Sequence, residues 1–244
     1  MAKKVPKLIK KDNIILQDID SITKFAKKVP KFINYNKNKE MVWTIAFMIL
    51  LFVALFGTSA LFKSFNHFTY KGLSFTKEKF GTIPVYHYYY YFTDSNTGKQ
   101  YQYNLYLRID PRKNNVSMPL GETEFSKEAI NYLTVNGSGL TSCTTSARDL
   151  GSLAELFSAN MLPMKAGTMD SIEAKSNNLT YITCDNKPAN PVIQIFSGNE
   201  TKITIDHNCY NIQIANCQTL EAIEKFKLQT ILDAKARSLN QTNN

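Results

Sequence analysis

Histidine, tryptophan and cysteine are scarce in this chain of 244 residues, which has three histidines, one tryptophan and four cysteines. No pair of cysteines has the Cys-x-x-Cys spacing of thioredoxin-like redox centres and zinc ribbons. The chain also lacks the glycine-rich fingerprints that bind nucleotide phosphates. We therefore predict no cofactor, no metal site and no catalytic residues.

The three histidines, His67, His87 and His207, are too widely separated to indicate an active site on their own. A hydrolase needs a serine, a histidine and an acid brought together. His87 with Asp94 or Asp110 is the one combination that we weigh, and no spacing in the chain supports it. His207 and Cys209 offer two metal ligands, but they lie in a predicted turn, where neighbouring residues rarely bind one metal.

Charge is absent from Met41 to Phe62, a run of 22 residues. As a helix it is about 33 Å long, enough to cross a hydrocarbon core of about 30 Å. The run is longer than the apolar core of a signal peptide, and about 40 residues precede it. It has no polar face, which a helix packed on a soluble core would show. We predict a transmembrane helix over residues 41–62, with Trp43 at the membrane interface.

Arginine is absent from residues 1–40, whereas lysine occurs there eleven times against four acidic residues. Most of the net charge of +9 therefore lies beside the apolar run. By the positive-inside rule this tail is cytoplasmic, and the C-terminal domain is extracytoplasmic. Because the membrane accounts for the basic charge, we predict no nucleic-acid partner.

Within the tail, apolar residues from Ile15 to Val29 recur at spacings of three and four, which is typical of one helical face. Lys24, Lys27 and Lys28 fall on the other side. A basic amphipathic helix is suited to lying on an anionic leaflet, so these lysines are predicted membrane-surface contacts. The alternative is a helix that packs on a cytoplasmic partner.

All four cysteines follow the apolar run, and an even number in an oxidising compartment indicates two disulfides. If Cys209 to Cys217 is one straight strand, its ends lie about 26 Å apart. A disulfide requires Cα atoms within about 7 Å, so these two cysteines do not pair with each other. Two connectivities stay open, and each joins Cys143 and Cys184 to the two ends of this strand.

A β-hairpin is predicted from the β-prone runs 85–92 and 100–109, which flank a turn-rich segment. Its tyrosines suggest a binding surface, since tyrosine combines a large apolar area with one polar group. The candidate surface consists of Tyr86, Tyr88, Tyr90 and Tyr106. The alternative is that the aromatic residues pair across the two strands.

Further strands are predicted at 130–135, 179–184, 191–196, 201–206 and 209–214, with hairpin turns at 197–200 and 207–208. Helices are predicted at 146–161, 170–175 and 219–238, the first of them begun by a capping box of Ser146 and Asp149. The fold class is α+β, with antiparallel strands and packed helices. We expect a β-rich part at 63–138 and a β/α part at 139–244.

Three segments together resemble a group of uncharacterised single-pass membrane proteins of small-genome archaea. They are Phe75 to Gly81 with the tyrosine-rich strand, Leu107 to Arg112, and Pro191 to Glu200 leading into Cys209 and Cys217. The resemblance covers most of residues 64–235. It implies a location in the cell envelope and implies no activity.

We therefore predict a membrane-anchored, disulfide-stabilised extracytoplasmic binding or assembly protein. Its partners are the lipid membrane and a protein or glycan that contacts the tyrosine-rich hairpin. One alternative is a membrane-tethered enzyme of the outer face, either a hydrolase or a thiol oxidoreductase. Another is an accessory subunit of a larger membrane complex.

Overall fold

The computed structural model describes residues 39–94, 97–121 and 123–241, so the predicted tail helix with Lys24, Lys27 and Lys28 lies outside the described residues. The chain divides into two compact units, Met1–Ala60 and Leu61–Asn244. Helix α2 (Lys39–Asn66) contains the window Met41–Thr58, which has a mean hydropathy of 2.3 and no buried part. Trp43 is 76% exposed. Helix α2 is thus long and apolar enough to cross a membrane by length and composition.

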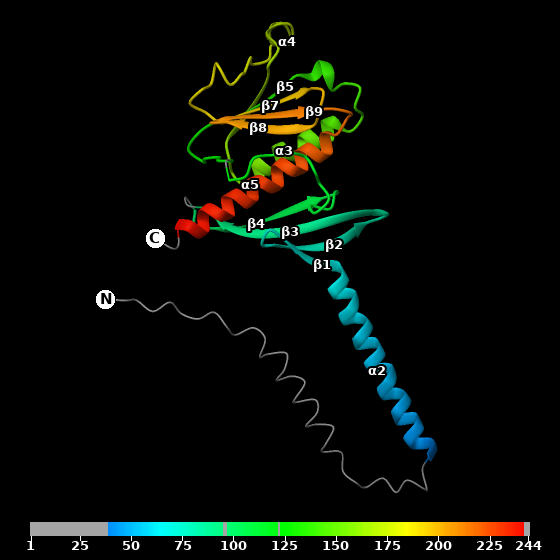
Figure 1. Ribbon diagram of the computed structural model, residues 1–244. Helices are drawn as coiled ribbons and strands as arrows, with labels where there is room; N and C mark the ends of the chain where they lie inside the picture. Colours follow the sequence, from blue (N-terminus) through cyan, green and yellow to red (C-terminus); the bar gives the residue numbers. More distant parts are fainter. Residues whose placement is uncertain (1–38, 95–96, 122, 242–244) are drawn as a thin grey trace, which may run out of the picture. The chain divides into compact units, whose positions relative to one another are not determined.

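The first sheet is antiparallel, and its four strands follow one another in chain order (Figure 1). They are β1 (His67–Tyr70), β2 (Leu73–Phe80), β3 (Ile83–Thr93) and β4 (Gln100–Leu107). Strands β1 and β2 are joined by Lys71 and Gly72, whose φ angles of 45° and 79° are those of a type I′ turn. Strands β3 and β4 form the predicted tyrosine-rich hairpin, and their pairing confirms it.

The second sheet is mixed, with the strand order β6-β5-β7-β9-β8. Its strands are β5 (Asn131–Val135), β6 (Met164–Thr168), β7 (Val192–Ser197), β8 (Lys202–Asp206) and β9 (Cys209–Ile214). Only β8 and β9 pair antiparallel, and the other neighbours are parallel. The α+β class is confirmed, but the prediction of antiparallel strands throughout is wrong for this sheet.

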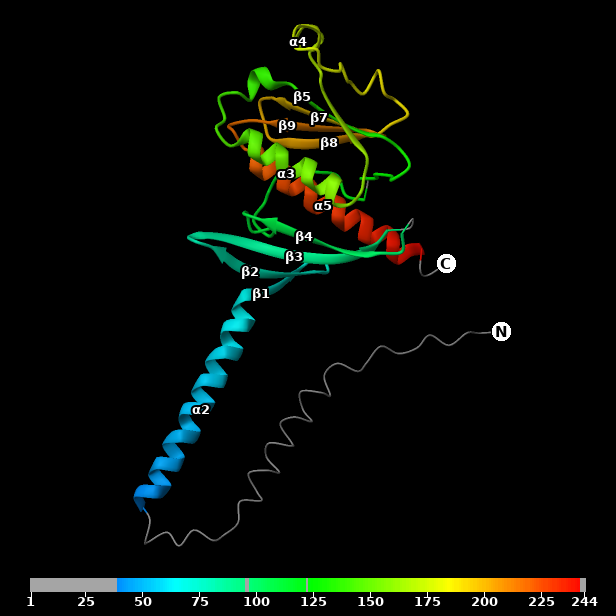
Figure 2. The same cartoon turned by 180° about the vertical axis from the view of Figure 1, so that it is seen from behind.

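Two helices, α3 (Ser146–Ala159) and α5 (Thr219–Gln241), lie between the two sheets in both views (Figure 1, Figure 2). The layers are therefore sheet, helices and sheet. A 3₁₀ helix, η1 (Gly137–Gly139), and a short helix, α4 (Ser171–Ser176), complete the described elements. Asp170 caps α4, because its carboxylate accepts hydrogen bonds from the N–H groups of Ile172 and Glu173.

One apolar core extends through these layers. It includes Phe75 of the first sheet, Ile193 of the second and Ile223 of α5, each with 0% exposure. Phe125 joins the layers, with its ring centroid 4.8 Å from that of Phe157. Residues 61–244 form one compact unit. The two parts that we expected at 63–138 and 139–244 thus contribute to one main core, beside a smaller cluster of Tyr132, Ile182 and Val192.

Both disulfides agree with the strand geometry. Cys143 pairs with Cys217, and Cys184 pairs with Cys209, with Cα atoms 5.3 and 5.6 Å apart. This is one of the two connectivities left open by the sequence. The strand itself ends at Ile214, before Cys217.

One strand prediction and one hairpin prediction in the second half are wrong. Segment 179–184 forms only an isolated bridge between Tyr181 and Thr168. Ile182 of this segment is nevertheless fully buried, in a small cluster with Tyr132 and Val192. Segment 197–200 is not a hairpin turn, because β9 lies between β7 and β8 in the sheet.

The capping box predicted for α3 is also wrong. The helix begins after Thr145, which makes no side-chain capping bond. Ser146 Oγ lies 3.0 Å from Thr219 Oγ1 at the start of α5, so it links the two helices. Asp149 is buried and accepts hydrogen bonds from the guanidinium of Arg148.

Candidate functional site

The tyrosine-rich hairpin presents its aromatic residues on two faces. Tyr86, Tyr88 and Tyr90 are partly buried and pack against the core. Tyr106 lies opposite His87 in the register, on the other face, and is 42% exposed. The four tyrosines of the predicted binding surface therefore do not form one surface, because successive residues of a strand point to opposite sides.

Cross-strand pairing of aromatic residues, the alternative interpretation, is present. Tyr90 lies opposite Tyr103, with ring centroids 5.4 Å apart. Phe92 stacks on Tyr101 at 5.8 Å. Such pairs stabilise a sheet by roughly 0.2–1 kcal/mol each, so much of the tyrosine content serves the fold.

A cavity of about 510 Å³ lies beside the inner face of this hairpin. Four segments that are distant in the sequence line it: β3, residues 125–127, the end of α3 with Leu162, and the last turns of α5. Its walls are mainly apolar or aromatic, and include Phe92, Phe125, Leu156 and Ile231. Pockets for single small molecules are typically about 300–1,000 Å³ and largely apolar.

Tyr90 and Asn160 place a fixed polar group in this cavity. The Tyr90 hydroxyl donates a hydrogen bond to Asn160 Oδ1 at 2.5 Å. Asn160 Nδ2 donates to the carbonyl of Leu156 at 2.7 Å, which holds the amide at the end of α3. Burial raises the pKa of Tyr90 to about 12. The phenol is therefore a neutral hydrogen-bonding group at physiological pH.

The charged residues that line the cavity are all basic: Lys127, Lys235 and Arg237. Lys127 Nζ lies 5.4 Å from the centroid of the Phe92 ring. Lys235 Nζ donates to the carbonyl of Gly72 at 2.8 Å, and Arg237 Nη1 donates to the carbonyl of Thr123. In the part of the chain that the structure describes, the ion pairs include none of these three cations.

The outer face of the hairpin has a different character. His87 bridges Glu78 and Asn104, with Nδ1 2.8 Å from Glu78 Oε1 and Nε2 3.1 Å from Asn104 Oδ1. The pairings of His87 with Asp94 or Asp110 are not formed, and Asp110 instead accepts hydrogen bonds from Arg112.

Around this bridge, Tyr89 is 51% exposed and Tyr91 is 56% exposed, and Tyr106 stacks on His87 at 4.5 Å. These three tyrosines (Tyr89, Tyr91 and Tyr106) are called the outer tyrosines below.

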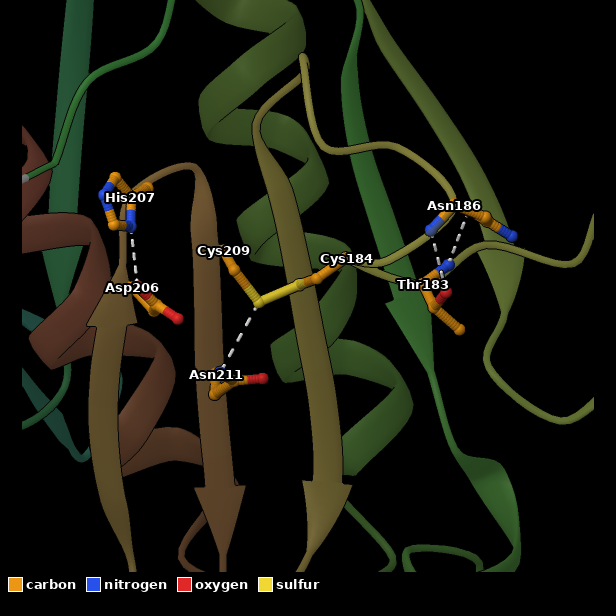
Figure 3. Close-up of a disulfide and its surroundings, with 7 residues drawn as sticks. All are labelled: Thr183, Cys184, Asn186, Asp206, His207, Cys209 and Asn211. Atoms are coloured by element: carbon orange, nitrogen blue, oxygen red, sulfur yellow. Dashed lines mark hydrogen bonds and ion pairs between the residues drawn. A yellow bond between two sulfur atoms is a disulfide. The ribbon is translucent and has the colours of Figure 1, made fainter.

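A second cavity, of about 520 Å³, lies beside the disulfide between Cys184 and Cys209. Figure 3 shows this disulfide with Asn211, whose Nδ2 lies 3.5 Å from Cys209 Sγ, and with His207 beside Asp206. The side chains of His207 and Asp206 are 92% and 81% exposed. Across residues 39–94, 97–121 and 123–241, no group of three or more potential ligands could hold a metal ion.

The layers also enclose charged side chains. Both oxygens of Glu224, on α5, accept hydrogen bonds from the backbone N–H groups of Arg108 and Ile109, at 2.6 and 2.9 Å. Burial raises the pKa of Glu224 to about 7. Burial also lowers the pKa of Lys227, one turn further along α5. Because Glu224 satisfies the backbone just beyond the end of β4, we interpret this cluster as a structural link between α5 and the first sheet.

Comparison with protein-family models, curated proteins and solved structures finds no match for this chain. The cavity beside the hairpin is therefore described by its own geometry. Sequence reasoning missed it because no single segment contains its residues. The one available signal was the alternation of β3, which places Tyr88 and Tyr90 on the inner face, although Tyr91 of the outer face also lines the cavity.

Proposed function

We propose that this protein is a single-pass membrane protein whose extracytoplasmic domain binds a small apolar ligand. Helix α2 would cross the membrane, with the lysine-rich tail in the cytoplasm. Three features support this topology: the uncharged and unburied window of α2, the excess of lysine before it, and two disulfides after it. Disulfides are typical of oxidising compartments outside the cytoplasm.

The binding role depends on one observation, the cavity of about 510 Å³ between β3, α3 and α5. An apolar cavity with a few convergent polar groups is the usual form of a ligand site. Here the polar groups are the hydrogen-bonded pair Tyr90 and Asn160, and the basic residues on the wall.

The test of this role is binding of a small neutral aromatic probe, 5-fluoroindole, followed by broadening of its ¹⁹F NMR signal. The full chain is held in nanodiscs of zwitterionic lipid, and empty nanodiscs correct for partitioning. Ala234 lines the cavity, whereas Ala236, also exposed on α5, does not. We expect broadening with the wild type and with Ala236→Phe, and its loss with Ala234→Phe. Equal broadening in all three proteins would contradict the role.

A second role, contact with a protein or glycan partner, is favoured by the exposure of the outer tyrosines. A photo-crosslinking residue at position 89 in the full chain should give a discrete adduct in cells. The matched control carries it at position 172, where Ile172 is 79% exposed on α4. Identical adducts from both positions would count against a specific surface.

A further inference from the structure

We infer that the cavity beside the hairpin takes a single-chain amphiphile with a carboxylate head, such as a fatty acid. This inference rests on the proposed ligand-binding function and specifies the chemical class of its ligand. It follows from two independent properties of the cavity wall, its charge and its apolar surface.

The charge of the wall is of one sign. Lys127, Lys235 and Arg237 line the cavity, and its described lining contains no aspartate or glutamate. Each of the three cations contacts a neutral group, a carbonyl oxygen or an aromatic ring. A guanidinium has five N–H donors and an ammonium has three, so a single carbonyl bond leaves donors to spare. An anionic head would add charge-assisted hydrogen bonds, which are about twice as strong as neutral ones.

The nearby acid on α5, Asp233, does not line the cavity. Asp233 is 4% exposed, and its carboxylate accepts hydrogen bonds from Thr123 and Gln229. Those bonds hold Thr123 against α5. The Asp233 carboxylate therefore stabilises the fold through these hydrogen bonds.

The apolar part of the wall fits a hydrocarbon chain. Phe92 comes from β3, Phe125 from the 125–127 segment, and Leu156 and Leu162 from α3 and the loop after it. The hydrocarbon tail of a ligand bound among these side chains would be removed from water, and so would the side chains themselves. Each buried methylene raises the affinity by about fourfold, the equivalent of about 0.8 kcal/mol.

The experiment is calorimetric titration of the full chain in zwitterionic nanodiscs with octanoate, octan-1-ol and hexanoate, corrected with empty nanodiscs. We expect octanoate to bind at least about tenfold more tightly than octanol, because only octanoate offers charge-assisted bonds. Hexanoate should bind up to about fifteenfold more weakly than octanoate, since it has two fewer methylenes.

Two variants assign the effect to the cavity. The double variant Lys127→Gln/Arg237→Gln should remove most of the preference for octanoate over octanol. The matched control, Lys165→Gln/Lys175→Gln, removes two exposed lysines outside the cavity and should keep that preference. Near-UV circular dichroism of the tyrosines checks that each variant is folded.

The outcomes separate this inference from the function on which it rests. Equal binding of octanoate and octanol would overturn the carboxylate head and leave a ligand site. If 5-fluoroindole binds but neither octanoate nor octanol does, the hydrocarbon tail of the inferred ligand would be contradicted as well. If 5-fluoroindole also fails to bind, the proposed function falls together with the inference.

Discussion

Helices α2 and α5 have similar lengths, 28 and 23 residues, but opposite relations between polarity and burial. No part of the uncharged window of α2 is buried. In contrast, α5 carries Glu224, Lys227 and Asp233, which are 5%, 4% and 4% exposed. The difference shows that burial depends on what surrounds a helix. Sheets flank α5 on both sides, whereas the apolar surroundings that α2 requires are, in our proposal, lipid.

The largest expected effect tests how α5 is held in place. The disulfide between Cys143 and Cys217 joins the residues just before α3 and α5 and closes a loop of 74 residues, against 25 for the other disulfide. Loop entropy predicts losses in unfolding free energy of about 4.5 kcal/mol for Cys143→Ser/Cys217→Ser and about 3.5 kcal/mol for Cys184→Ser/Cys209→Ser. Urea unfolding of the full chain in nanodiscs measures both. A larger loss from the shorter loop would reverse the expected order.

The same substitution in the two helices sharpens the comparison. Phe226 on α5 is fully buried against Phe125 and Tyr210, whereas Phe52 on α2 is 55% exposed. Phe226→Ala should lower the unfolding free energy of the domain by about 3–5 kcal/mol, because it leaves a cavity in the core. Phe52→Ala should change it by less than about 0.5 kcal/mol. Equal losses would show that the two helices share one folding core.

The buried carboxyl of α5 predicts a dependence of stability on pH. The pKa of Glu224 is raised from 4.5 to about 7, so the folded chain holds this proton more tightly than the unfolded chain. Its contribution is therefore fully present below pH 4.5 and is lost as the pH rises through about 7. We expect a decrease of about 3 kcal/mol over that window.

Urea unfolding at a series of pH values measures this decrease. Glu224→Gln should flatten the curve, and the exposed control Glu128→Gln should not. A wild-type curve without a slope in this window would count against the burial of a titrating carboxyl.

The smallest expected effect concerns the neighbour of Glu224. The positive charge of Lys227 lowers the pKa of Glu224 and so opposes part of the effect of burial. Lys227→Met should shift the pH midpoint of the stability decrease upward, because it removes a positive charge that lowers the pKa of Glu224. Lys225→Met, which changes a half-buried lysine on the same helix, should leave the midpoint in place. A downward shift would contradict the assigned interaction.

Local patterns predicted much of the fold. The uncharged run Met41 to Phe62 predicted α2, and alternation along residues 85–109 predicted the tyrosine-rich hairpin. The expectation that Cys209 and Cys217 do not pair with each other is confirmed, although the straight strand assumed for it ends at Ile214. Each of these inferences needs only the residues within one segment, or a distance limit between two of them.

Long-range arrangement could not be predicted in the same way. Strand β9 inserts between β7 and β8, so the turn at 197–200 links strands that are not neighbours. Nothing in that turn distinguishes the two arrangements, because the strands on either side have the same β-prone composition. Burial of α5 depends on two sheets formed by residues far away in the chain.

The candidate site was predictable only in part. The tyrosine-rich hairpin was predicted as a candidate binding surface, and its two faces follow from the alternation of side chains along a strand. The basic residues Lys127, Lys235 and Arg237 gave no signal, because they come from separate segments that only the fold brings to one cavity.

The most direct test concerns the proposed topology of the full chain, with α2 in lipid and the disulfide-bonded domain outside the cytoplasm. The chain carries different epitope tags at its two ends, and spheroplasts of the expression host are treated with a protease that does not cross membranes. We predict removal of the C-terminal tag from intact spheroplasts, and removal of the N-terminal tag only after permeabilisation. Removal of the N-terminal tag alone, or of both tags, from intact spheroplasts would contradict the account.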